Sequence, residues 1–173
     1  LALSEKLSSF FSARFPDPQV KSYREFYDNT LRLLRSKDLD SFDLNKESSA
    51  MREKYGMGKF GQGCLLARRL VETGVRYVEV STDGWDMHNN LESEMQDLSP
   101  AFDQAYAALI SDLDDRGMLD DTLVVMATEF GRKPQFNGNG RGHYPICYST
   151  VLAGGGVKRG FVHGSSDKEG AYP

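Results

Sequence analysis

The chain has 173 residues, and its 21 basic and 25 acidic side chains give a formal net charge of −4. This length fits one domain or a large part of one. The negative balance offers no bulk attraction for nucleic acid or an anionic membrane. No apolar run approaches the ~18 residues of a membrane span. Two cysteines cannot form a disulfide framework.

The first part of the chain is charged and has a helical pattern. Between Ser22 and Arg35, apolar side chains recur at nearly helical spacing, which predicts an amphipathic helix. The polar stretch 36–49 is rich in Asp, Ser and Lys and predicts a connection with short helical turns. We therefore expect residues 1–55 to form a helical N-terminal segment of the same domain as the rest.

From residue 56 to residue 173, helical and strand patterns alternate. The expected elements are, in order, a helix over 60–71 that stops at Gly74, a strand over 75–81, a helix that begins with Ser99 and Pro100, a strand over 122–127 and a short strand over 148–153. Helices and strands that alternate through short joints predict an α/β fold with a mainly parallel sheet flanked by helices. We expect 56–173 to form this sheet portion and to carry the functional loops.

Candidate metal ligands follow the predicted strands. In open α/β sheets, ligands bind beyond the carboxyl ends of the strands. Asp86 and His88 follow the first strand, Glu129 follows the second, and His143 lies in a loop rich in glycine and asparagine. Carboxylate oxygens and imidazole nitrogens bind zinc at ~2.0–2.2 Å. We name these four residues as candidate ligands of a divalent metal, with zinc, manganese and calcium as candidate ions.

The same residues also allow structural interpretations. Asp86 could cap a turn, and His88 could be a surface or packed histidine. Glu129 could form an ion pair with Arg132 or Lys133, which lie three and four residues further along the chain. The spacing alone does not decide between these roles and metal binding.

Two arginines are candidates for binding an anionic substrate group. The guanidinium fork of Arg132 matches phosphate or sulfate, and Arg141 lies in the glycine-rich loop. A catalytic nucleophile is not identified, since the sequence contains no Gly-x-Ser-x-Gly elbow and no serine or cysteine in an obvious triad context. Cys64 lies on the apolar stripe of its helix and is expected in the core. We expect His163 to be structural or exposed.

Five stretches carry a resemblance to a known family: FGQGCLLARRLVETGVR at 60–76, GWDMH at 84–88, TEFGRKP at 128–134, GRGHYP at 140–145 and LAGGGV at 152–157. In this order they resemble the bacterial family catalogued as domain of unknown function 1501. That family looks like a branch of the alkaline phosphatase superfamily, which includes sulfatases and cofactor-independent phosphoglycerate mutases. The resemblance covers roughly residues 37–173. It implies an alkaline-phosphatase-like, sulfatase-like fold.

The resemblance also implies roles for the candidate ligands. Asp86 and His88 resemble the Asp and His that hold one metal of a two-metal site, and His143 resembles the last His of that site. Glu129 and Phe130 stand where the superfamily has the Asp-His pair of the second metal. The second metal site therefore looks altered.

Other parts that the resemblance implies are missing. Gly142 stands where family members often carry an Asp. In the superfamily, the first metal-binding Asp and the Ser or Thr nucleophile lie upstream, near the end of the first strand. Nothing before Phe60 looks like that strand. We therefore expect the chain to be a partial domain, the C-terminal portion of a longer protein. It would hold about half of a two-metal site and would have no activity on its own.

Three functions are compatible with these observations. The first is a metal-dependent hydrolase of phosphate or sulfate esters, with a small anionic ester or a sulfated or phosphorylated glycan as its substrate. The second is a non-catalytic domain that binds an anion, a glycan or a protein through a decayed metal site. The third is a structural domain in which the polar residues only stabilise loops. The resemblance implies a periplasmic or exported location.

Overall fold

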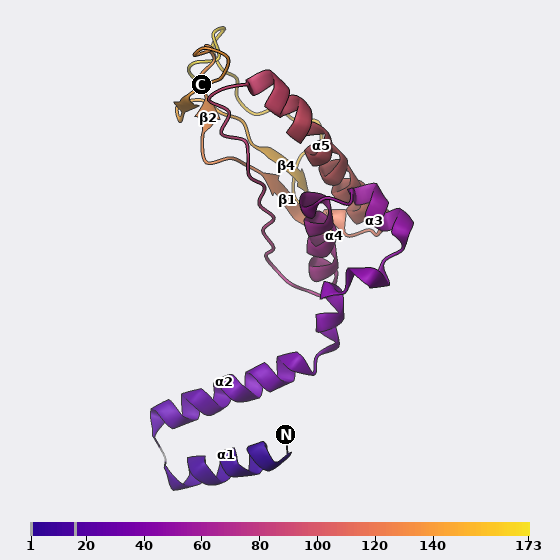
Figure 1. Cartoon of the computed structure of the whole chain (residues 1–173), viewed down its shortest axis with the longest axis vertical. Coiled ribbons are helices and arrows are strands. Elements are labelled where there is room, and N and C mark those ends of the chain that lie inside the picture. The colour runs from indigo at the N-terminus through magenta and orange to yellow at the C-terminus, as the bar shows by residue number, and fades with distance from the viewer. Residues whose placement is uncertain (1, 16) are drawn as a thin grey trace. The chain divides into compact units, whose positions relative to one another are not determined.

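The computed structural model of the chain describes residues 2–15 and 17–173 and divides into two compact units, 1–43 and 44–173 (Figure 1). The first unit contains α1 (Ala2–Arg14), α2 (Pro18–Leu34) and the 3-10 helix η1 (Lys37–Phe42). The second unit contains η2 (Leu44–Lys46), α3 (Ser49–Tyr55), α4 (Lys59–Glu72), α5 (Leu91–Asp115), η3 (Leu119–Asp121), β1 (Leu123–Met126), β2 (Gly131–Arg132), β3 (His143–Tyr144) and β4 (Val151–Gly154). None of the described helices combines the length and the apolar character needed to span a bilayer.

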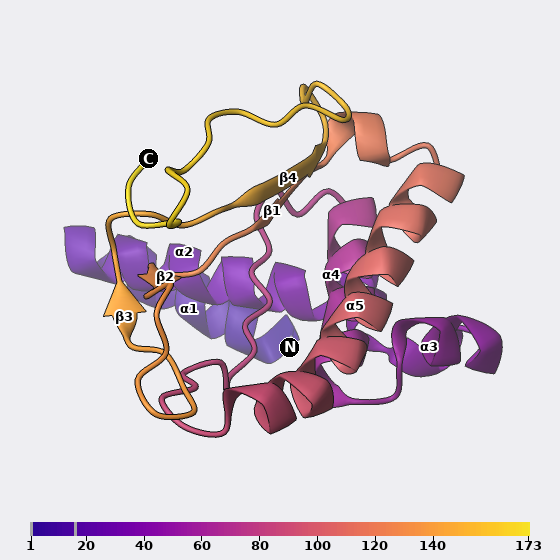
Figure 2. The same cartoon turned by 90° about the horizontal axis from the view of Figure 1, so that it is seen from above.

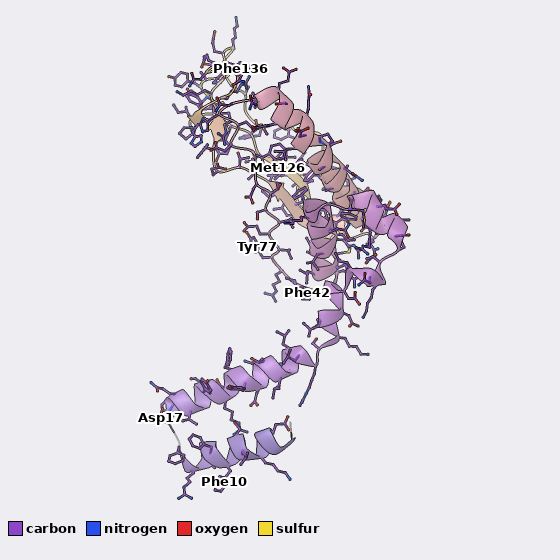
Figure 3. All side chains as sticks on the ribbon, in the orientation of Figure 1. Phe10, Asp17, Phe42, Tyr77, Met126 and Phe136 are labelled. Atoms are coloured by element: carbon purple, nitrogen blue, oxygen red, sulfur yellow. The ribbon has the colours of Figure 1, made fainter. Side chains whose placement is uncertain are left out.

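The first unit is a helical hairpin. The helix predicted over 22–35 is confirmed as α2, which begins after Asp17, whose carboxylate accepts a hydrogen bond from the backbone nitrogen of Gln19 at 2.7 Å. The described part of this unit buries no large apolar side chain. Phe10 on α1, labelled in Figure 3, is 66 % exposed. The hairpin therefore presents aromatic side chains without a hydrophobic core of its own.

The core of the second unit lies where α3, α4 and α5 meet. The predicted helix over 60–71 is confirmed as α4, which ends before Gly74 with its φ of 93°. Cys64 is buried, as expected. The buried apolar cluster consists of Tyr55, Cys64, Leu65, Ala105 and Ala108. At Gly61, a Cβ atom would lie 2.1 Å from the carbonyl oxygen of Tyr55, so only glycine allows α3 and α4 to approach this closely.

A buried ion network joins these helices. Arg68 on α4 is 1 % exposed, and its Nε lies 2.8 Å from Oδ2 of Asp112 on α5. Its Nη2 lies 2.8 Å from Oε1 of Glu47, and its Nη1 lies 2.7 Å from Oε2 of Glu72. The Tyr55 hydroxyl donates a hydrogen bond of 2.9 Å to the same oxygen of Asp112. A buried guanidinium is tolerated here because carboxylates surround it.

The expected mainly parallel sheet flanked by helices, of alkaline-phosphatase type, is wrong. The second unit has two separate antiparallel pairs, β1 with β4 and β2 with β3 (Figure 2). Parallel strands need a crossover connection, usually a helix. No helix lies among residues 127–150 between β1 and β4, so the chain returns along β1 in the opposite direction.

Two further expectations about this unit are also wrong. The predicted strand over 75–81 is extended but pairs with no other strand among the described residues, and Tyr77 is 78 % exposed (Figure 3). The helix expected to begin at Ser99 begins at Leu91, so Pro100 lies inside α5. Ser99 therefore lies within the helix and does not cap its N-terminus, where Asn90 precedes the first helical residue. The strand over 122–127 is confirmed as β1.

Removing one carboxylate of the ion network should destabilise the fold. Asp112→Asn would remove the carboxylate that lies against the Nε atoms of both Arg68 and Arg116, and breaking a buried pair in this way costs ~3–5 kcal/mol. The free energy of unfolding, measured by urea denaturation, is expected to fall by this amount. Asp115→Asn on the same helix is the matched control, since Asp115 is 73 % exposed and its ion pair is with Lys54, at 3.6 Å. Equal stability of the two variants would show that the network does not support the fold.

The network also predicts loss of stability in acid. Burial opposes ionisation of Asp112, but hydrogen bonds from Arg116 and Tyr55 and the charge of Arg68 outweigh it and lower the pKa of Asp112. A carboxyl group with a lowered pKa in the folded state contributes stability above its unfolded pKa and loses it as the pH falls through the folded pKa. The free energy of unfolding should therefore decrease below pH ~4. In Asp112→Asn this decrease should be shallower, and identical slopes would contradict the assignment.

Candidate metal centre

The short β2–β3 ladder and the segment before α5 position the candidate residues. Arg132 on β2 pairs directly with His143 on β3, so their side chains lie next to each other on one face of the ladder. Asp86 and His88 lie in the segment between α4 and α5, just before α5 begins. Sequence positions more than 40 residues apart are thereby brought to one place.

The loop between β2 and β3 docks on the segment before α5. The backbone nitrogen of Arg141 donates a hydrogen bond of 3.1 Å to the carbonyl oxygen of Met87, whose side chain is buried. A Cβ atom on Gly140 would lie 2.1 Å from the carbonyl oxygen of His88. Glycine at this position therefore allows the two backbones to touch, and this contact fixes His143 relative to His88.

Asp86, His88 and His143 form a cluster that could hold a metal ion. The Nε2 atoms of His143 and His88 lie 2.8 Å and 3.1 Å from Oδ1 of Asp86, and 3.1 Å from each other. Ligand atoms bound to one zinc ion in a tetrahedron at ~2.0–2.1 Å are ~3.3 Å apart. The three atoms need to separate by only a few tenths of an ångström to fit, so the donor set and its spacing suit such an ion.

Arg132 is the fourth group at this cluster. Its Nη1 donates a hydrogen bond to Oδ1 of Asp86, and it is less exposed than the three candidate ligands. Hydrogen bonds from Arg132 and then from His143 lower the pKa of Asp86 to about 2. Asp86 is therefore an ionised carboxylate at neutral pH, which is the form that binds a cation.

The structure separates the other candidates from this cluster. Glu129 is 66 % exposed, and its Oε1 lies 4.0 Å from Nη2 of Arg132. It therefore takes the ion-pair position that the sequence allowed as an alternative to metal binding. The guanidinium of Arg141 lies 4.8 Å over the ring of Phe136, and its buried Nε has no hydrogen-bond partner within residues 2–15 and 17–173.

From the sequence, Phe130 was assigned only the position at which the superfamily has a histidine ligand of the second metal. Its ring centroid lies 4.3 Å from that of His143, and the guanidinium carbon of Arg132 lies 5.4 Å from its centre. Phe130 thus contacts His143 and Arg132, the two residues of the β2–β3 ladder that lie at the cluster. The alternation of Phe130 and Arg132, two positions apart, was the signal that could have placed both on one face of an extended segment.

The cluster predicts stoichiometric metal binding. After incubation with zinc and exhaustive dialysis, plasma mass spectrometry should find near one zinc ion per chain. His143→Ala should lose most of this metal, because it removes one of three protein ligands. His163→Ala is the matched control, since His163 contacts Phe161 and lies outside the cluster. Equal metal content in both variants would contradict the assignment.

The comparisons with known proteins agree with the sequence motifs at the level of the family. Neither the curated proteins nor the solved structures gave a match to this chain. The family described as "Protein of unknown function (DUF1501)" matches residues 1–173, including every residue of the cluster. The chain therefore belongs to the DUF1501 family.

Proposed function

We propose that this chain supplies the metal-binding and anion-binding part of a hydrolase that cleaves phosphate or sulfate esters. The observation that carries the proposal is the convergence of Asp86, His88 and His143 on one point, with Arg132 on the same carboxylate oxygen. Three protein ligands that leave a coordination position open are typical of catalytic rather than structural zinc sites. The order of the sequence motifs, which resembles that of sulfatases and alkaline phosphatases, favours the same chemistry.

Each residue of the cluster would have a separate role in binding. Asp86, His88 and His143 would hold the cation, which when bound supplies positive charge to polarise the ester oxygen. Arg132 would bind and orient the anionic group, because its planar fork matches two oxygens of a phosphate or sulfate. Its position beside Asp86 keeps it at the edge of the metal cluster. We further propose that the nucleophile comes from outside this sequence, so that the chain binds the ester without cleaving it.

A second candidate function is a non-catalytic domain that binds an anion, a glycan or a protein. The placement of Glu129 and Phe130 favours it. Glu129 lies beside Arg132 and not in the cluster, and the ring of Phe130 lies against His143. The residues that the superfamily would use for a second metal thus make other contacts here. A site reduced to one cation keeps affinity for anions more readily than it keeps catalysis.

Binding and turnover distinguish these functions. The zinc-loaded chain should bind inorganic phosphate or sulfate, measured by calorimetry, and should not release 4-nitrophenol from its phosphate or sulfate ester. A longer native polypeptide that contains this sequence should release it, and His143→Ala in that polypeptide should lower kcat/KM by at least ~100-fold, the scale of one lost group in a metal site. Lys158→Ala is the control in the same polypeptide, because Nζ of Lys158 lies 4.7 Å over the ring of Phe161 and Lys158 is not part of the cluster.

Each other outcome has a definite meaning. Anion binding without turnover in the longer polypeptide would support the binding domain instead of the hydrolase. Turnover by the present chain, lost in His143→Ala, would show that the nucleophile lies within these 173 residues. Neither anion binding nor turnover in either protein would contradict the hydrolase and would also contradict a domain that binds anions.

A further inference from the structure

Arg132 and a metal ion would compete for the same atom. The Oδ1 atom of Asp86 is the carboxylate oxygen nearest to both histidine Nε2 atoms, and it is also the acceptor of the hydrogen bond from Arg132. A carboxylate oxygen has two lone-pair positions. Three nitrogen atoms already lie around Oδ1, so a cation bound there must weaken or replace the contact with Arg132.

The balance of charges at the site also favours release of Arg132 from Asp86 when a cation binds. Without a metal, Arg132 neutralises Asp86. A divalent cation bound to Asp86 would leave Arg132 beside an excess of positive charge. Like charges that are in close contact repel each other, so this arrangement costs free energy. Glu129 offers Arg132 only weak compensation, because it is exposed and 4.0 Å away. A doubly charged anion between the cation and the guanidinium would restore neutrality.

The ladder geometry lets Arg132 serve both partners. Its backbone is fixed by pairing with His143, and the ring of Phe130 lies against its guanidinium. Only the side-chain torsions of Arg132 need to change for the fork to turn from Asp86 to an anion beside it. The side chain is 25 % exposed, so solvent and small anions reach it.

We propose that Arg132 couples metal binding to oxyanion binding: it pairs with Asp86 in the metal-free protein and with a tetrahedral dianion, phosphate or sulfate, once a divalent cation is bound. This inference rests on the proposed function, since it requires the metal cluster. Because the coupling is an equilibrium property, each ligand raises the affinity of the other by the same factor.

The test measures the affinity for Zn²⁺ by competition with a zinc-responsive chelator, without anion, with inorganic sulfate and with inorganic phosphate. In the wild-type chain, saturating anion should tighten zinc binding ~5-fold or more, the range of ordinary coupling between sites. Arg132→Gln should bind zinc several-fold more tightly than wild type without anion, because the competing cation is gone. In Arg132→Gln, a saturating anion should change the zinc affinity by less than ~2-fold. Arg132→Lys keeps the charge and should retain the weaker zinc binding, while its anion effect should be smaller than that of wild type because lysine lacks the bidentate fork.

Arg159→Gln is the matched control, because Arg159 is 78 % exposed and pairs with Asp120 at 3.4 Å. It should behave as wild type, and circular dichroism of every variant checks that the fold is intact. If wild type binds zinc but Arg132→Gln shows the same zinc affinity and the same anion effect, the coupling is wrong and the metal centre stands. If wild type binds no zinc, the metal centre itself is wrong, and the coupling is overturned with it. An anion effect with only sulfate or only phosphate would identify which of the two dianions the site takes.

Discussion

The buried guanidinium of Arg68 is the constraint on which the second unit depends. It holds three carboxylates from different parts of the chain, Glu47, Glu72 and Asp112, at hydrogen-bond distance. A charge that is 1 % exposed is stable only when all its partners are present. Tyr55 belongs both to this network and to the apolar cluster of α3, α4 and α5, so ion pairing and apolar packing together hold α4 against α5.

The candidate metal centre is built on this frame through backbone contacts. The segment between α4 and α5 carries Asp86 and His88, and both helices that bound it belong to the packed core. The loop of the β2–β3 ladder docks on that segment where Gly140 touches the backbone of His88. The core thus fixes one half of the cluster, and a glycine contact sets the distance to the other half.

The cluster contains few charged groups, and this determines how it could bind ions. One ionised carboxylate serves two imidazoles and one guanidinium. In the coupling that we propose, such a site would bind a cation at the expense of its own ion pair, and the freed arginine would then favour an anion. A second carboxylate in the cluster would bind the cation more strongly and weaken the link to the anion. Glu129 lies beside Arg132 and outside the cluster, so the cluster contains the single carboxylate of Asp86 among the described residues.

The sequence by itself determined the local features: the amphipathic helices α2 and α4, the strand β1, and the loops in which Asp86, His88 and His143 are found. Helical periodicity, glycine stops and β-branched runs depend on neighbours along the chain, and these are visible in one sequence. Only the tertiary structure decided which strands pair, in which direction, and that 75–81 pairs with none of the described strands. It also decided that His143 meets Asp86 while Glu129 does not. Strand pairing and side-chain convergence depend on contacts distant in sequence, which local pattern does not encode.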